Sequence, residues 1–171
     1  MDYPVEPPTR RSFLRTCVLT GIGLLGANGL LRGQAVGSMQ LPVAGPGDPE
    51  VPNEQVARIL RDLFGDRPIQ AGHITLDMPA VAEDGRIVPV IIESDLPMTA
   101  DRYVKAVHLI VDHNPDPHLA AYHLTPALGS VALQTRIKMK RTTWVRAILE
   151  TSTGEVHAAY AHVNVSLNGC G

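Results

Sequence analysis

The chain has 171 residues, which suits one domain with an extension, and 44% of them are hydrophobic, enough to build a buried core. Its formal net charge of −2 gives no indication of nucleic-acid binding. The 14 prolines and 15 glycines favour short strands and turns over a helical bundle, and the small number of aromatic residues leaves Val, Ile, Leu and Ala to form the core.

The N-terminal segment, residues 1–37, is predicted to be a twin-arginine export signal that is removed from the mature protein. Adjacent Arg10 and Arg11 are followed by Phe13 and Leu14, and a glycine-rich apolar stretch comes next. This stretch is too short for a stable membrane span, so we expect no membrane anchor. The alternative is a basic arm in front of a core helix.

Removal of this signal would leave the mature chain with one cysteine, Cys170, because Cys17 leaves with the signal. Four arginines and two acidic residues leave as well, which changes the formal net charge from −2 to −4. A lone cysteine in an oxidising compartment such as the bacterial periplasm has no internal disulfide partner. Its thiol is therefore either free and reactive or bonded to another chain.

Residues 38–52 are rich in proline and glycine and are predicted to be a linker. A helix of about eleven residues is expected between Asn53, which can cap its start, and Gly65, which can end it. Its apolar residues recur at helical spacing, so one face needs a surface to cover, either on the domain or on a partner.

From Pro68 the pattern changes to short apolar segments separated by turns. Pro89 lies inside one of these segments and places it at a sheet edge or a bulge. Residues 53–167 are therefore predicted to form a mainly β domain, an immunoglobulin-like antiparallel β-sandwich with one short N-terminal helix. Strands are expected at residues 69–78, 86–93, 103–112, 118–124, 130–140, 143–150 and 155–167, with turns at 83–85 and 114–117.

The last four residues, Asn168-Gly169-Cys170-Gly171, are predicted to form a flexible cysteine arm at the end of the last strand. Glycine leaves the backbone unrestricted and gives the sulfur no side-chain neighbour. Three residues beyond Leu167 can extend roughly 10 Å. The alternative is a frayed terminus with an accidental cysteine.

Three histidines, His113, His118 and His123, recur at every fifth position and raise the question of a metal site. An odd spacing on one strand puts neighbours on opposite faces, so we expect them not to converge and predict no metal site. A basic patch is expected on one sheet face, either solvated or able to dock an acidic partner; it comprises Arg136, Lys138, Lys140 and Arg141. Motifs for nucleophilic catalysis or phosphate binding are lacking, so we expect no catalytic residues.

Several segments together resemble the SoxY-type sulfur carrier proteins of periplasmic thiosulfate oxidation. The resemblance runs from about Gln55 to the C-terminus and depends on short motifs rather than on one long match. These motifs are Gly72-His73-Ile74-Thr75-Leu76-Asp77-Met78-Pro79, Glu83-Asp84-Gly85, Val88-Pro89-Val90, Leu96-Pro97-Met98 with Tyr103-Val104, Asn114-Pro115 with Pro117, Thr135-Arg136-Ile137 and Val165-Ser166-Leu167-Asn168-Gly169-Cys170-Gly171.

The resemblance implies that Cys170 holds sulfur intermediates covalently, with Asn168, Gly169 and Gly171 as its flexible flanks and without a cofactor. It also implies a heterodimer with a SoxZ-type β-sandwich subunit, and a c-type cytochrome, a hydrolase and a sulfur dehydrogenase as further partners. The family's Gly-Gly-Cys-Gly-Gly ending is altered here, because Asn168 replaces the first glycine and the last glycine is missing. This departure bears on which partners accept the arm and on the sulfur species carried.

The sequence thus predicts a non-enzymatic carrier that presents sulfur intermediates on Cys170 to partner enzymes. One alternative is a periplasmic β-sandwich that binds a partner without any covalent cargo. Another is a thiol redox enzyme such as a peroxidase, which would have to work without a resolving cysteine.

Overall fold

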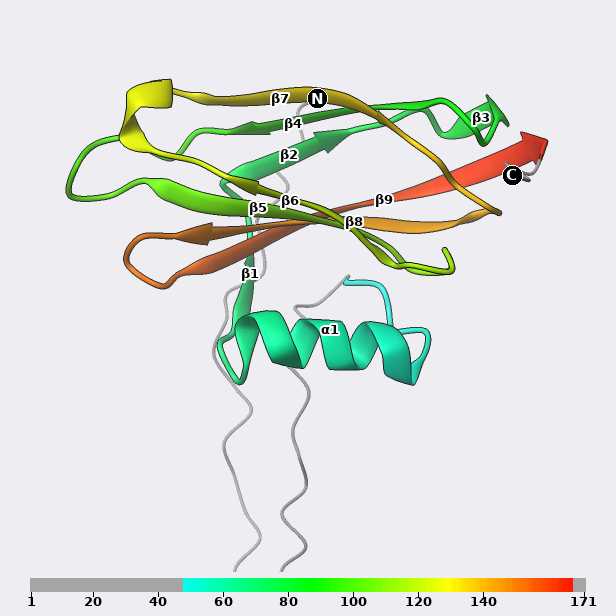
Figure 1. Cartoon of the computed structure of the whole chain (residues 1–171), viewed down its shortest axis with the longest axis horizontal. Helices are drawn as coiled ribbons and strands as arrows, with labels where there is room; N and C mark the ends of the chain where they lie inside the picture. The colour runs from blue at the N-terminus through cyan, green and yellow to red at the C-terminus, as the bar shows by residue number, and fades with distance from the viewer. Residues whose placement is uncertain (1–47, 168–171) are drawn as a thin grey trace, which may run out of the picture. The chain divides into compact units, whose positions relative to one another are not determined.

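The computed structural model describes residues 48–167, which form a mainly β domain with one α-helix (Figure 1). The predicted immunoglobulin-like β-sandwich with one N-terminal helix is confirmed. The predicted export signal, the first ten residues of the predicted linker and the predicted cysteine arm lie outside the described residues. The elements are α1 (Glu54–Phe64), β1 (Ile69–Ala71), β2 (Ile74–Asp77), β3 (Val81–Asp84), β4 (Val88–Ser94), β5 (Val104–Val111), β6 (His118–His123), a 3₁₀ turn η1 (Pro126–Leu128), β7 (Val131–Ile137), β8 (Thr143–Thr151) and β9 (Val156–Leu167).

The strands form two sheets that face each other (Figure 1). The larger sheet has the order β1-β9-β8-β5-β6, and β3 also pairs with β9; the smaller sheet has the order β2-β4-β7. Strand β9 runs antiparallel to β8 along most of its length and parallel to two short strands, β1 at its start and β3 at its end. The last residue of β9 is Leu167, directly before the predicted cysteine arm.

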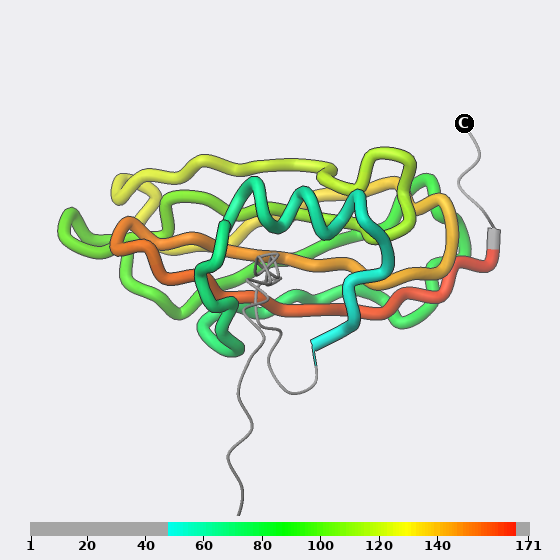
Figure 2. The backbone as a smooth tube through the Cα atoms, turned by 90° about the horizontal axis from the view of Figure 1, so that it is seen from below, coloured from blue at the N-terminus to red at the C-terminus, as the bar shows by residue number. Residues whose placement is uncertain are grey.

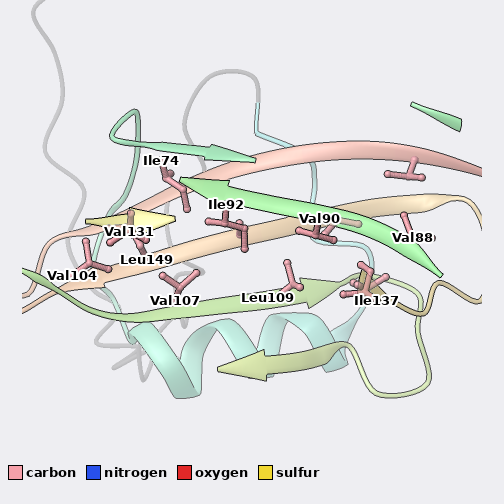
Figure 3. Packing of buried hydrophobic residues seen from close by; sticks show 14 of the residues in the cluster. Ile74, Val88, Val90, Ile92, Val104, Val107, Leu109, Val131, Ile137 and Leu149 are labelled. Atoms are coloured by element: carbon pink, nitrogen blue, oxygen red, sulfur yellow. The ribbon is translucent and has the colours of Figure 1, made fainter. Parts of the chain in front are cut away.

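The core between the two sheets consists of aliphatic side chains that alternate along each strand (Figure 3). Val90 and Ile92 from the smaller sheet and Val107, Leu109 and Leu149 from the larger sheet are each at most 1% exposed. The expected core of Val, Ile, Leu and Ala is therefore present. Such close packing gives the larger sheet a rigid inner face.

Helix α1 covers part of the outer face of the larger sheet (Figure 2). The backbone N–H of Val56 donates to Oδ1 of Asn53 at 3.0 Å, and Gly65 ends the helix with a φ of 60°, so both predicted ends are confirmed. The side chains that meet in this second cluster are Val56, Leu60 and Phe64 from α1, and Ile110, Ile148, Val156 and Ala158 from the sheet. The apolar face of the helix is thus covered by its own domain and does not itself require a partner.

Two predicted element boundaries were wrong near the start of the sandwich. Residues 69–78 are not one strand, because Gly72 and His73 both have positive φ angles, 94° and 62°, and the chain crosses there from the larger sheet to the smaller one. Residues 83–85 are not all turn, since Glu83 and Asp84 belong to β3 and the turn begins at Gly85.

Pro89 lies in β4, the central strand of the smaller sheet, yet it borders only one other strand. It lies opposite Arg136 of β7, whereas β2 pairs only with the residues from Ile91 to Ser94. At Pro89 the sheet therefore has a local edge, which agrees with the prediction for a residue that has no N–H to donate.

Candidate functional site

The candidate site is the end of β9, because the predicted attachment residue Cys170 follows this strand by three positions. Cys170 and its predicted flanks Asn168, Gly169 and Gly171 lie outside the described residues, so their role stays a prediction. The same holds for the residues of the predicted export signal, Arg10, Arg11, Phe13 and Leu14. The structure describes the base from which the predicted arm starts.

Neighbouring segments on both sides hold this base. On one side Thr143 of β8 lies opposite Val163, and the Thr142 hydroxyl accepts a hydrogen bond from the N–H of Val165 at 2.9 Å. On the other side β3 pairs with the final residues of β9, and the N–H of Asn164 donates to the carbonyl of Ala80 at 2.9 Å. Val163 is fully buried in the core. The strand is thus fixed by hydrogen bonds and by packing almost to its last residue.

An ion pair lies beside the last residue of β9. Asp84 of β3 is opposite Leu167, and its carboxylate accepts hydrogen bonds from Nε of Arg86 at 3.0 Å and from Nη2 at 2.7 Å. These hydrogen bonds, together with one from the backbone N–H of Arg86, hold the pKa of the Asp84 carboxyl below its ordinary value. The pair places opposite charges next to each other and leaves little net charge at this position.

The predicted basic patch is not on a sheet face, because β7 ends at Ile137. Only Arg136 belongs to the strand; Lys138, Lys140 and Arg141 lie exposed on the connection from β7 to β8. The side chain of Asn114 fixes this connection, since its Nδ2 donates to the carbonyl of Lys138 at 2.7 Å and its Oδ1 accepts from the N–H of Lys140 at 3.0 Å. The connection leads directly into Thr142, so its cations lie at the same end of the domain as the end of β9.

The histidines are arranged differently from the prediction. His113 contacts Thr143, with Nδ1 2.7 Å from the hydroxyl. His118 and His123 share a face of β6 because a bulge shifts the pairing with β5, so that they lie opposite Ile110 and Ala106. The argument that an odd spacing separates these two side chains was therefore wrong. Among residues 48–167, however, no group of three His, Cys, Asp or Glu side chains is arranged to hold a metal ion.

Sequence reasoning missed His108, which is buried on β5. Its Nδ1 lies 3.2 Å from Nε2 of His118, and its ring meets the edge of Phe64 at a centroid distance of 5.4 Å. Burial, and then the neighbouring His118, lower the pKa of His108 to about 4. The signal that could have found it is its place in an apolar strand, two residues from Ala106 and two from Ile110, because alternate residues of a strand share one face.

Sequence reasoning also missed the exposed aromatic pair next to the candidate site. Trp144 of β8 is 37% exposed and meets His162 of β9 at a ring-centroid distance of 5.1 Å and an angle of 70°. The alternation in residues 143–150 already places Trp144 on the face opposite to the core residue Val145. The pair lies on the outer face of the larger sheet, near the end of β9.

Comparison with protein families finds one matching family, described as sulfur oxidation protein SoxY, whose model matches residues 60–170. The chain belongs to the SoxY family. The match ends at Cys170, so it includes the base of the predicted arm and the predicted attachment residue. Membership in the SoxY family confirms the resemblance that the sequence motifs indicated.

The fold of this SoxY family member is also found in a solved structure. The sulfur carrier protein SoxY from Chlorobium limicola f thiosulfatophilum is 23% identical, with 66% of this chain and 97% of that chain covered and a TM-score of 0.52. A superoxide reductase (neelaredoxin) from Ignicoccus hospitalis is 13% identical, with 57% and 94% covered and a TM-score of 0.47. No curated protein sequence matches the chain. Within residues 48–167 no helix is long and apolar enough to cross a membrane.

Proposed function

We propose that this chain is a non-enzymatic carrier that holds sulfur intermediates covalently on Cys170 and presents them to partner enzymes. The observation that carries the proposal is the SoxY family match, which extends to Cys170, the one cysteine of the predicted mature chain. The rigid end of β9 supports it, since a fixed base lets a short arm deliver its thiol from a defined position.

In the proposed loading step, the sulfur of Cys170 forms a bond to the terminal sulfur of thiosulfate. The thiol proton leaves to solvent, and two electrons leave to an oxidant, for which we propose a c-type cytochrome partner. The product is a cysteine S-thiosulfonate, which carries one negative charge. The chain itself supplies the nucleophile, and the thiolate is the form that reacts.

In the proposed release step, water attacks the sulfonate sulfur of this adduct on a partner hydrolase. The bond between the two outer sulfurs breaks, sulfate and a proton leave, and a persulfide remains on Cys170. A sulfur dehydrogenase is the proposed partner that oxidises this remaining sulfur. The carrier holds the intermediate through each step and needs no cofactor for that role.

We further propose that the carrier works in the periplasm as a heterodimer with a SoxZ-type subunit. The twin-arginine pattern of Arg10, Arg11, Phe13 and Leu14 supports export, and the family resemblance supports the heterodimer. Size-exclusion chromatography of the mature chain, alone and co-expressed with a SoxZ-type subunit, tests the assembly. A chain that elutes as a monomer in both preparations contradicts it.

The proposal is tested by intact-mass measurement of the mature protein purified from its native periplasm, before and after addition of a reductant. We expect an adduct with the mass of a thiosulfonate or of sulfane sulfur, mapped to Cys170 and lost on reduction. An unmodified thiol or a simple disulfide dimer, even after thiosulfate is supplied to the cells, contradicts the carrier role. That result would favour a partner-binding module without covalent cargo.

A Cys170→Ser variant tests the same proposal in cells. We expect loss of thiosulfate oxidation, because the serine hydroxyl neither forms the disulfide-type bond nor ionises at neutral pH. Thermal unfolding of the purified variant should match that of the wild type, since the described domain ends before Cys170. Sulfur oxidation at the wild-type rate by Cys170→Ser would refute the proposed attachment site.

A further inference from the structure

The outer face of the larger sheet is covered along the first part of β9 and open along the last part. Helix α1 covers Val156 and Ala158, and the carbonyls of Pro49 and Glu50 accept hydrogen bonds from Arg146, whose guanidinium lies 5.6 Å from the ring of Tyr160. Beyond Tyr160, the outer side chains of β9, His162 and Asn164, are exposed. The open part leads directly to Leu167.

This open area has an apolar and aromatic centre. Trp144, the single tryptophan of the chain, is 37% exposed beside His162, and Val81 of β3, which lies opposite Asn164, is 55% exposed. We call Val81, Trp144, His162 and Asn164 the β9-end surface. Tryptophan is strongly enriched among the residues that carry the binding energy of protein interfaces. An exposed tryptophan held in a rigid sheet next to a second ring is suited to fill a pocket on another protein.

Cations border the β9-end surface on one side. Lys140 and Arg141 lie on the connection that leads into β8, four and three residues before Trp144, and Lys138 lies just before them. Among the described residues none of these three side chains has a carboxylate within ion-pair distance. The Asn114 side chain holds their backbone in place. On the opposite side, next to β3, Glu83 is an exposed carboxylate and the Arg86 cation is paired with Asp84. The cations that have no carboxylate partner among the described residues therefore lie on the side of the β7–β8 connection.

We propose that the β9-end surface is the docking site for the c-type cytochrome partner that loads thiosulfate onto Cys170. The partner is expected to receive Trp144 in an apolar pocket and to place acidic side chains opposite Lys140 and Arg141. This inference rests on the proposed carrier function, and it adds where the partner binds and what chemistry its surface has. A partner docked here lies within the roughly 10 Å that three residues beyond Leu167 can span. Docking therefore raises the effective concentration of the cysteine at the partner's active site.

The experiment measures the initial rate of thiosulfate adduct formation on Cys170 by intact mass, with the purified c-type cytochrome partner and thiosulfate. The carrier is the full mature chain together with any subunit that co-purifies with it. Trp144→Ala is expected to lower kcat/KM for the carrier by about tenfold or more. The double variant Lys140→Glu/Arg141→Glu is expected to lower it by a similar factor at low ionic strength and by less as salt is added.

Two matched variants control for general effects of exposed side chains. Leu128→Ala removes an apolar side chain that is 48% exposed on η1, and Arg58→Glu reverses an exposed charge on α1. Neither residue belongs to an element of the β9-end surface, so both variants should load at the wild-type rate. Trp144→Phe, which keeps an aromatic ring, should recover much of the loading rate. Urea unfolding of each variant confirms that it is folded.

Three outcomes are informative. Slow loading of the Trp144→Ala and charge-reversal variants, with both controls at the wild-type rate, supports the docking site. Loading of every variant at the wild-type rate overturns the docking site but leaves the carrier function intact. If the wild-type chain itself acquires no adduct, the carrier function fails and the docking site fails with it. A ¹⁹F NMR measurement with 5-fluorotryptophan at position 144 tests docking directly. The signal should shift when the cytochrome is added, and an unchanged signal would show that the cytochrome binds elsewhere.

Discussion

Strand β9 joins two regions of the larger sheet that are stabilised in different ways. In its first half Val156 and Ala158 pack under α1, and the helix, the strand and the neighbouring strands share one apolar cluster. In its second half the outer side chains, His162 and Asn164, are exposed. There the strand is held mainly by its inner face and by hydrogen bonds from its backbone N–H groups to the Thr142 hydroxyl and the Ala80 carbonyl. The same strand thus builds the core at one end and supports the predicted arm at the other.

This difference separates stability from function along one element. Burial of apolar surface contributes most of the free energy of folding, so the covered half should dominate the stability of the domain. The open half offers side chains to solvent or to another protein without disturbing the core. Substitutions in the covered half should therefore act on unfolding, whereas substitutions on the β9-end surface should act on the proposed loading reaction.

The largest effect on the free energy of unfolding is expected for Phe64→Ala, which lies over the covered half of β9. Phe64 is 1% exposed and fills the space between α1 and the sheet, so truncation removes buried area and leaves a cavity. We expect a loss of about 3–5 kcal/mol in the free energy of unfolding, measured by urea denaturation. Trp144→Ala should cost much less, because that side chain is already partly in water. Equal losses of unfolding free energy for Phe64→Ala and Trp144→Ala would contradict the proposal that the two halves of β9 differ in their contribution to stability.

An intermediate loss in the free energy of unfolding is expected at low pH, because His108 is buried beneath helix α1. Because burial lowers the pKa of His108 to about 4, the unfolded chain binds a proton more readily than the folded chain, and stability is lost as the pH falls from about 6.5 toward 4. This group should account for about 1–3 kcal/mol of that loss. The neighbouring His118, His123 and Lys105 also lower the pKa of His108, whereas Glu150 raises it.

The measurement compares urea unfolding of the wild type and His108→Gln at pH 7.5 and at about pH 4.5. The variant should lose less stability between the two pH values, because it lacks the buried imidazole. His162→Gln, on the same face of the larger sheet but exposed, is the matched control and should behave like the wild type. An identical pH dependence for the wild type and His108→Gln would show that the imidazole does not determine acid sensitivity.

The sequence predicted the elements whose signals are local. Asn53 and Gly65 mark the ends of α1 because capping depends on residues within one turn, and the alternation in residues 143–150 and 155–167 gives the faces of β8 and β9. The break at Gly72 and His73 was missed because the apolar alternation continues across it, and only the positive φ angles separate β1 from β2.

Features that depend on distant parts of the chain could not be predicted. The pairing of β3 with β9 joins two segments about 80 residues apart through a strand of four residues, and a bulge in β6 decides which face His118 takes. Cys170 was singled out by its position and its isolation, and the family match includes it. Trp144 was not singled out from the sequence, because its exposure depends on where α1 and residues 49–50 stop covering the sheet.

The smallest effect on the free energy of unfolding is expected for Arg86→Gln, next to the last residue of β9. Arg86 lowers the pKa of Asp84, so this carboxylate contributes to stability at neutral pH and the contribution is lost as the pH falls through its folded pKa. The variant should raise the pKa of Asp84 toward its ordinary value in a ¹³C NMR titration, whereas Arg58→Gln on α1 should leave it unchanged. Since both partners lie at the surface, urea unfolding should change little. Amide exchange at Asn164 should also stay slow, because backbone pairing holds β3 to β9; fast exchange there would show instead that the open half depends on this ion pair.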